Sequence, residues 1–92
     1  MSGGKRWRLD AARFVVRELD DEAIVLDQKT GDYYTLEGPG ALALRLFIGG
    51  TGTPGVVREI AARYDASEKT IEKDVGALLR EFEKKGILRS EK

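Results

Sequence analysis

The first part of the chain alternates apolar and polar residues in short runs, and turn residues separate these runs. β-Branched and aromatic residues dominate the runs, as is typical of half-buried strands. Strands are expected over residues 13–17, 23–26 and 32–36. Asp20-Asp21 marks the first reversal, and Gly31 is expected to take the positive φ of a tight turn with a bulge. Two tight turns predict an antiparallel meander, and its third strand would lie at an exposed edge.

After residues 37–40 the apolar spacing becomes helical. A short and mostly apolar helix is expected to end at Gly49-Gly50, and a second helix to begin at Pro54 with Thr53 as its cap. Ser67 is placed to cap a third helix. The apolar stripe of this third helix comprises Ile71, Val75, Leu78, Leu79 and Phe82. The order predicts an α+β, winged-helix-like fold, in which a three-stranded antiparallel sheet precedes three helices.

A chain of 92 residues has room for one hydrophobic core. We expect one domain over residues 12–88, with a short tail over residues 89–92. Residues 1–11 are basic and Gly-rich, and we expect them to be flexible unless Trp7 or Leu9 docks on the domain. The N-terminus lacks the apolar core of a secretory signal, and no apolar run approaches the length of a membrane span. These features predict a cytoplasmic protein.

Composition argues against catalysis. The chain has neither His nor Cys, which removes thiol nucleophiles, the usual zinc ligands and the commonest general base. Its carboxylates are numerous, but none is paired at a spacing that suits an acid dyad. The Gly-rich stretch 49–55 follows a helix and has no Lys-Ser/Thr pair, so it does not fit a phosphate loop. We therefore expect no enzymatic activity, no cofactor and no metal.

Two surfaces are candidates for binding. The third strand could accept an extended peptide as an added strand, unless its tandem tyrosines are ordinary strand residues. The third helix could enter DNA through Lys69, Lys73, Arg80 and Lys84. The chain has 16 basic and 16 acidic residues, and acidic side chains interleave with these cations, so the net field toward phosphates is weak. A winged-helix transcription regulator remains the alternative function, and a domain that scaffolds an enzyme through its helices is a third possibility.

The residues also carry a family resemblance. The run from Asp27 to Leu36, the Gly-containing break, the apolar helix and the Gly-rich gap look like the PqqD-like family, also called RiPP recognition elements. The stretches 73–79 and 85–88 are similar to the final helix and tail of that family, so the resemblance covers residues 12–88. The apolar run 40–46 looks closest to the standalone leader-binding proteins of lasso-peptide biosynthesis.

The resemblance implies a site and a set of partners. In that family the leader segment of a precursor peptide docks as an added strand on the third strand, in a cleft bordered by the third helix. The residues to which this role transfers are Asp32, Tyr33, Tyr34, Thr35, Leu36, Ile71, Lys73, Asp74, Val75 and Leu78. The implied partners are the leader, a leader-cleaving protease and a cyclase, with no nucleic acid and no membrane. An unfilled edge would leave the protein a monomer or allow a dimer through that edge.

Overall fold

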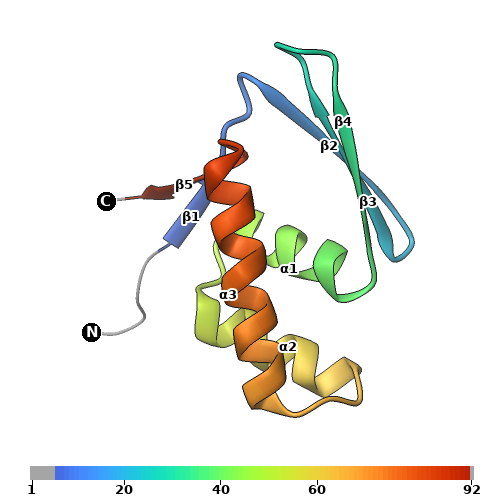
Figure 1. Ribbon diagram of the computed structural model, residues 1–92, viewed down its shortest axis with the longest axis vertical. Helices are drawn as coiled ribbons and strands as arrows, with labels where there is room; N and C mark the ends of the chain where they lie inside the picture. The colour runs from blue at the N-terminus through green and yellow to red at the C-terminus, as the bar shows by residue number, and fades with distance from the viewer. Residues whose placement is uncertain (1–5, 92) are drawn as a thin grey trace.

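The computed structural model describes residues 6–91, and its elements follow the order expected from the sequence with one strand added at each end (Figure 1). The strands are β1 (Arg6–Leu9), β2 (Phe14–Leu19), β3 (Glu22–Asp27), β4 (Tyr33–Glu37) and β5 (Leu88–Glu91). The helices are α1 (Pro39–Ile48), α2 (Thr53–Arg63) and α3 (Glu68–Lys84). The sheet β2-β3-β4 followed by three helices confirms the α+β prediction.

The three-stranded sheet is an antiparallel meander in the order β2-β3-β4. Its strands begin and end one or two residues away from the predicted limits. Val15 lies opposite Leu26, and Leu26 lies opposite Tyr33, so these three exposed residues share one face. The alternate residues, among them Phe14 and Val25, are buried on the other face. Within residues 6–91, β4 is paired on one side only.

A partly buried ion pair fixes the start of β2 to the end of β3. Arg13 donates from Nε and Nη2 to the two carboxylate oxygens of Asp27, at 2.9 and 2.7 Å. The backbone N–H of Lys29 donates to the same carboxylate at 2.9 Å. The Arg13 hydrogen bond is the main reason why the pKa of Asp27 lies well below its usual range, and it outweighs the burial of this side chain, which is 2% exposed. The loop into β4 is thereby anchored, and Gly31 within it adopts the predicted positive φ of 84°.

The helices follow their sequence signals with one exception. α1 packs against α2, α3, β1 and β4, which explains why its residues are apolar on most sides. Ser67 caps α3 as predicted, because its Oγ accepts a hydrogen bond from the Thr70 N–H. The predicted helix α2 is present, but its predicted cap was wrong: Gly52 is the cap residue, and Thr53 already belongs to the helix. None of these helices, within residues 6–91, combines the length and apolarity that crossing a membrane requires.

The two ends of the described chain pair with each other. β1 and β5 form a separate antiparallel pair in which Trp7 faces Ser90 and Leu9 faces Leu88. Trp7 is buried in the main core and Leu9 packs against it, which is the docking under which residues 6–9 were not expected to be flexible, and the tail is a strand up to Glu91. Each strand has only four residues, and its partner lies at the other end of the chain, so no local pattern announces the pairing. Residues 1–5 and 92 lie outside the described part.

Candidate functional site

The free side of β4 offers backbone hydrogen-bonding groups in a regular row. The Asp27 N–H donates to the Asp32 carbonyl at 2.8 Å, and in an antiparallel pair such bonds recur at every second residue. Alternate residues of β4 therefore bond to β3. The residues between them direct their N–H and C=O groups away from β3: Tyr33, Thr35 and Glu37. Among the described residues no strand lies on this side, so the edge can pair with another chain.

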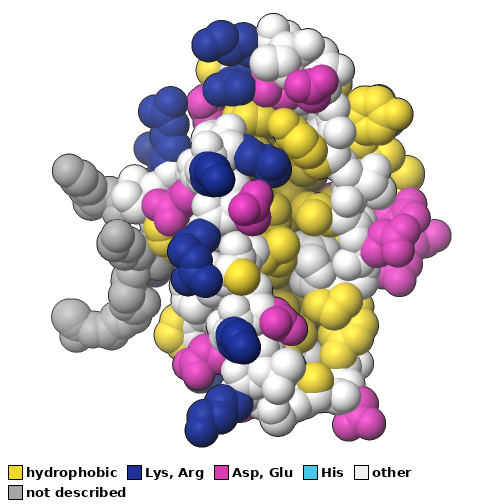
Figure 2. Space-filling model, in the orientation of Figure 1, with side chains coloured by type: hydrophobic (Ala, Val, Ile, Leu, Met, Phe, Trp, Pro, Cys, Tyr) yellow, Lys and Arg dark blue, Asp and Glu magenta, His cyan; other side chains and the backbone are white. Residues whose placement is uncertain are grey.

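An apolar groove runs beside this edge, between β4 and α3. Its first pocket has a volume of about 200 Å³ and lies next to the second half of α3. The residues that line it are Val25, Tyr34, Leu36, Leu78, Glu81, Phe82, Lys85 and Ile87. Figure 2 shows hydrophobic side chains gathered in a stripe along α3. The groove thus combines the open edge with an apolar floor.

A second pocket of about 330 Å³ continues the groove toward the start of α3. It is lined by Pro39, Gly40, Ile60, Tyr64, Ala66, Ile71, Asp74, Val75 and Leu78. Leu78 belongs to both pockets and is the residue that joins them. A Cβ built on Gly40 would lie 3.8 Å from the Cδ2 atoms of both Leu36 and Leu78. A side chain larger than that of Ala at position 40 would therefore fill the junction between the pockets.

Charged groups stand at the rim of the first pocket. Lys85 Nζ lies 4.9 Å from the centroid of the Tyr34 ring and 3.7 Å from Glu81 Oε1. Lys85 and Glu81 are exposed to solvent. Each of the two contacts of Lys85, with the Tyr34 ring and with Glu81, therefore adds no more than roughly 1 kcal/mol to stability. The rim is polar and close to neutral, whereas the floor is apolar.

The structure brings most of the predicted site residues to the groove. Six of them line its pockets: Tyr34, Leu36, Ile71, Asp74, Val75 and Leu78. Asp32, Tyr33 and Thr35 are exposed along the edge. Lys73 is exposed on α3 and lines neither pocket.

Other groove residues were missed from the sequence. They are Val25, Pro39, Gly40, Ile60, Tyr64, Ala66, Glu81, Phe82, Lys85 and Ile87. The sequence held a signal for three of them. Phe82 belongs to the apolar stripe of α3, and the i, i+4 spacing of Glu81 and Lys85 predicts their ion pair. No signal in the sequence showed that they face Tyr34.

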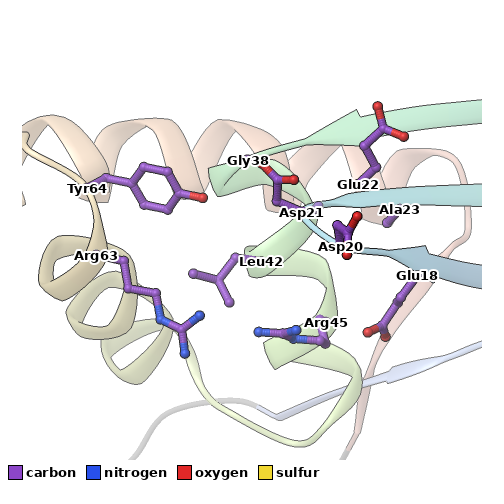
Figure 3. Close-up of a pocket in the computed structure, with 11 residues that line it drawn as sticks. Glu18, Asp20, Asp21, Glu22, Ala23, Gly38, Leu42, Arg45, Arg63 and Tyr64 are labelled. Atoms are coloured by element: carbon purple, nitrogen blue, oxygen red, sulfur yellow. The ribbon is translucent and has the colours of Figure 1, made fainter.

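A different cavity, of about 80 Å³, lies beneath the β2–β3 turn and is lined mainly by charged residues (Figure 3). Arg45 reaches it from α1 and Arg63 from α2. The hairpin contributes the carboxylates of Glu18, Asp20, Asp21 and Glu22. We call it the polar cavity. Residues 6–91 include no group of three or more His, Cys, Asp or Glu side chains that could hold a metal ion.

The solvent side of α3 mixes both signs of charge, as the blue and magenta side chains in Figure 2 show. Lys69, Lys73, Arg80 and Lys84 are exposed there. The acidic residues Glu68, Glu72, Asp74, Glu81 and Glu83 are exposed on the same helix. A phosphate backbone would meet repulsion and attraction together, unlike on the basic surfaces that bind DNA.

Comparisons with known proteins find one matching family model and two similar solved structures. The sequence profile of "Coenzyme PQQ synthesis protein D (PqqD)" matches residues 22–88. The solved structure of TbiB1 in complex with the TbiA(beta) leader peptide is 29% identical, with a TM-score of 0.80 over 89% of this chain and 94% of that one. Lasso peptide synthetase B1, complexed with its leader peptide, is 23% identical, with a TM-score of 0.81 over 91% of this chain and 98% of that one. No curated protein matches significantly.

Proposed function

Because the chain belongs to the PqqD family, we propose that it is a non-catalytic recognition element that binds the leader segment of a ribosomally made precursor peptide. The observation that carries this proposal is the open edge of β4 beside the apolar groove. The similarity to TbiB1, which was solved with a leader peptide, supports the same function. We propose the lasso-type class as the subclass, because the apolar run 40–46 resembles the standalone leader-binding proteins of lasso-peptide biosynthesis.

In the proposed complex the leader lies along β4 as an added strand. Hydrogen bonds to Tyr33, Thr35 and Glu37 supply affinity, and every second leader side chain enters the groove and supplies specificity. The ladder stops at Pro39, because proline has no N–H to donate. Beyond that point the leader can only add side-chain contacts in the second pocket.

Binding then delivers the rest of the precursor to its processing enzymes. Holding the leader raises the effective concentration of the attached core peptide at an enzyme that also binds this protein. We propose a leader-cleaving protease and a cyclase as those enzymes, in the cytoplasm. The chain has no His and no Cys, so the groove lacks a thiol nucleophile and the commonest general base.

Fluorescence anisotropy with a labelled synthetic leader, taken from the precursor encoded beside this gene, tests the proposal. We expect a Kd between micromolar and nanomolar, about −8 to −12 kcal/mol. Leu78→Asp places a charge between the two pockets and should weaken binding roughly 100-fold. The matched variant Ala77→Asp places the same charge on an exposed neighbour and should bind like the wild type.

The DNA-binding alternative makes the opposite predictions. It requires salt-sensitive binding to duplex DNA that Lys73→Glu or Arg80→Glu abolishes. The leader hypothesis requires leader binding that duplex DNA does not compete away and that neither variant removes. A wild-type protein that binds the duplex and ignores every leader encoded beside its gene would overturn the proposed function.

A further inference from the structure

Gly40 is a glycine whose backbone conformation does not call for one. It is the second residue of α1, and its φ is not positive. Gly38, which caps the same helix, differs, because its φ of 55° would strain a residue that has a Cβ. Alanine forms helices better than glycine does, so the chain gives up some helix stability at position 40. The backbone alone therefore does not explain the missing side chain.

Apolar groups from both walls of the groove surround the place of the missing Cβ. A Cβ at position 40 would lie 3.8 Å from Leu36 Cδ2 on β4 and 3.8 Å from Leu78 Cδ2 on α3. These are ordinary van der Waals distances, so the fold has room for a methyl group here. Leu36 lines the first pocket and Leu78 lines both. The space that Gly40 leaves open is therefore the junction between the two pockets.

The proposed leader strand would bring one side chain to this junction. Side chains of a strand alternate between its faces, so groove-facing leader residues follow one another at about 7 Å. Only one of them can stand over Leu78. A large apolar side chain there gains contacts in both pockets, whereas a small one leaves the junction unfilled. The open junction thus favours a leader with a large apolar residue at this point.

We infer that Gly40 determines which leaders this protein accepts, because its missing side chain makes room for the largest apolar side chain of the bound segment. This inference rests on the proposed function and assigns selection by size to one position of α1. A side chain at position 40 would exclude the large leader residue and favour a smaller one in its place. Each methylene lost or added at such a site changes affinity by roughly tenfold or more.

The experiment measures the Kd of wild type, Gly40→Ala and Gly40→Val by anisotropy. The probes are the labelled synthetic leader of the precursor encoded beside this gene, and peptides in which each large apolar or aromatic residue is replaced in turn by alanine. The matched control is Gly76→Ala. Gly76 is also a helical glycine without positive φ, but it lines neither pocket, and its Cβ would face Arg80 Nη1 at 3.7 Å.

Stability and leader affinity should change in opposite directions at position 40. Gly40→Ala and Gly76→Ala should each raise Tm by about 3 °C, because alanine restricts the unfolded chain and favours the helix. Gly40→Ala should weaken binding of the native leader about fivefold and Gly40→Val about fiftyfold, whereas Gly76→Ala should stay within about twofold of the wild type. One alanine-substituted peptide should bind the wild type about tenfold more weakly than the native leader does, and should bind Gly40→Val at least as well as the native leader does.

Unchanged leader affinity in both Gly40 variants would overturn the inference. So would an equal loss in Gly76→Ala, or a loss in the Gly40 variants that is the same for every peptide. If Gly40→Val does not fold, the peptide comparison is made with Gly40→Ala, whose Cβ meets its neighbours at 3.8 Å without a clash. A wild-type protein that binds no leader would instead refute the proposed function.

Discussion

The two edges of the β2-β3-β4 sheet are both unpaired within residues 6–91, yet they differ in what stands beside them. β4 runs along the apolar groove, with Tyr34 and Leu36 half-buried toward α3. The end of β2 runs past the polar cavity, where Glu18 faces charged neighbours. An open edge supplies hydrogen bonds to any extended chain, and only an apolar wall adds affinity and selects among sequences. This difference is the reason why we propose the β4 edge, and not the β2 edge, as the peptide-binding site.

The difference originates in α3. Its apolar stripe is wider than the core needs, so Leu78 remains partly exposed between the two pockets while Val75 is buried. Leu78 and Phe82 of α3 line the first pocket together with Tyr34 and Leu36 of β4, whereas no residue of β2 lines it. The surplus apolar surface is therefore available to a peptide on β4 alone.

The largest expected effect is a loss of stability on removal of the Arg13–Asp27 ion pair, which anchors the loop into β4. Asp27→Asn leaves Arg13 without its charged partner and weakens the loop into β4. Breaking an ion pair whose carboxylate is buried is strongly destabilising, so Tm should fall by about 10 °C at neutral pH. Asp20→Asn at the other turn should change Tm by no more than about 2 °C, because Asn tolerates the positive φ of 52° found there.

The stabilisation of the fold by the Arg13–Asp27 ion pair should decrease at acidic pH. Its pKa is lowered in the folded state, mainly by the Arg13 hydrogen bond, relative to about 3.9 when unfolded. The stabilisation is therefore complete above about pH 4 and is lost as the pH falls below that value. Thermal unfolding from pH 7 to pH 2 should show the wild type and Asp27→Asn converging at the acidic end. A constant difference in Tm across this range would contradict the assignment.

A smaller effect, on leader affinity, is expected when a single backbone N–H donor is removed from the β4 edge. Thr35→Pro deletes one N–H that faces the open side of β4, and its ring obstructs the added strand. Losing one hydrogen bond and the close approach should weaken leader binding about tenfold. Glu18→Pro is the matched change, since it removes an N–H from the free side of β2, and it should leave leader affinity unchanged.

Both proline variants need a check of folding, for which circular dichroism and Tm suffice. Edge strands accept proline where the N–H faces solvent, so each variant should remain folded. If Glu18→Pro lowered leader affinity as much as Thr35→Pro did, the two edges would be equivalent and the contrast between them would be wrong.

The sequence predicted the edge but not everything beside it. Gly31 and the alternation of residues 32–36 place the third strand, and the spacing of the α3 stripe gives the helix face, because both signals are local. The contact of Lys85 with Tyr34 joins residues far apart in the chain, so only the packing of α3 against the sheet reveals it. The pairing of β1 with β5 was missed for the same reason. Local periodicity specifies elements, whereas the neighbours of an element depend on the whole core.

The smallest expected effect concerns the polar cavity. Arg45→Glu adds a carboxylate opposite the acidic hairpin, but the position is exposed and water screens the repulsion. The free energy of unfolding should fall by less than about 1 kcal/mol, and leader affinity should stay within twofold. Urea unfolding and anisotropy measure the two quantities, with Arg45→Gln as the neutral control. A fivefold loss of leader affinity in Arg45→Glu but not in Arg45→Gln would mean that the leader extends past the groove to this cavity, and the groove would then be only part of the site.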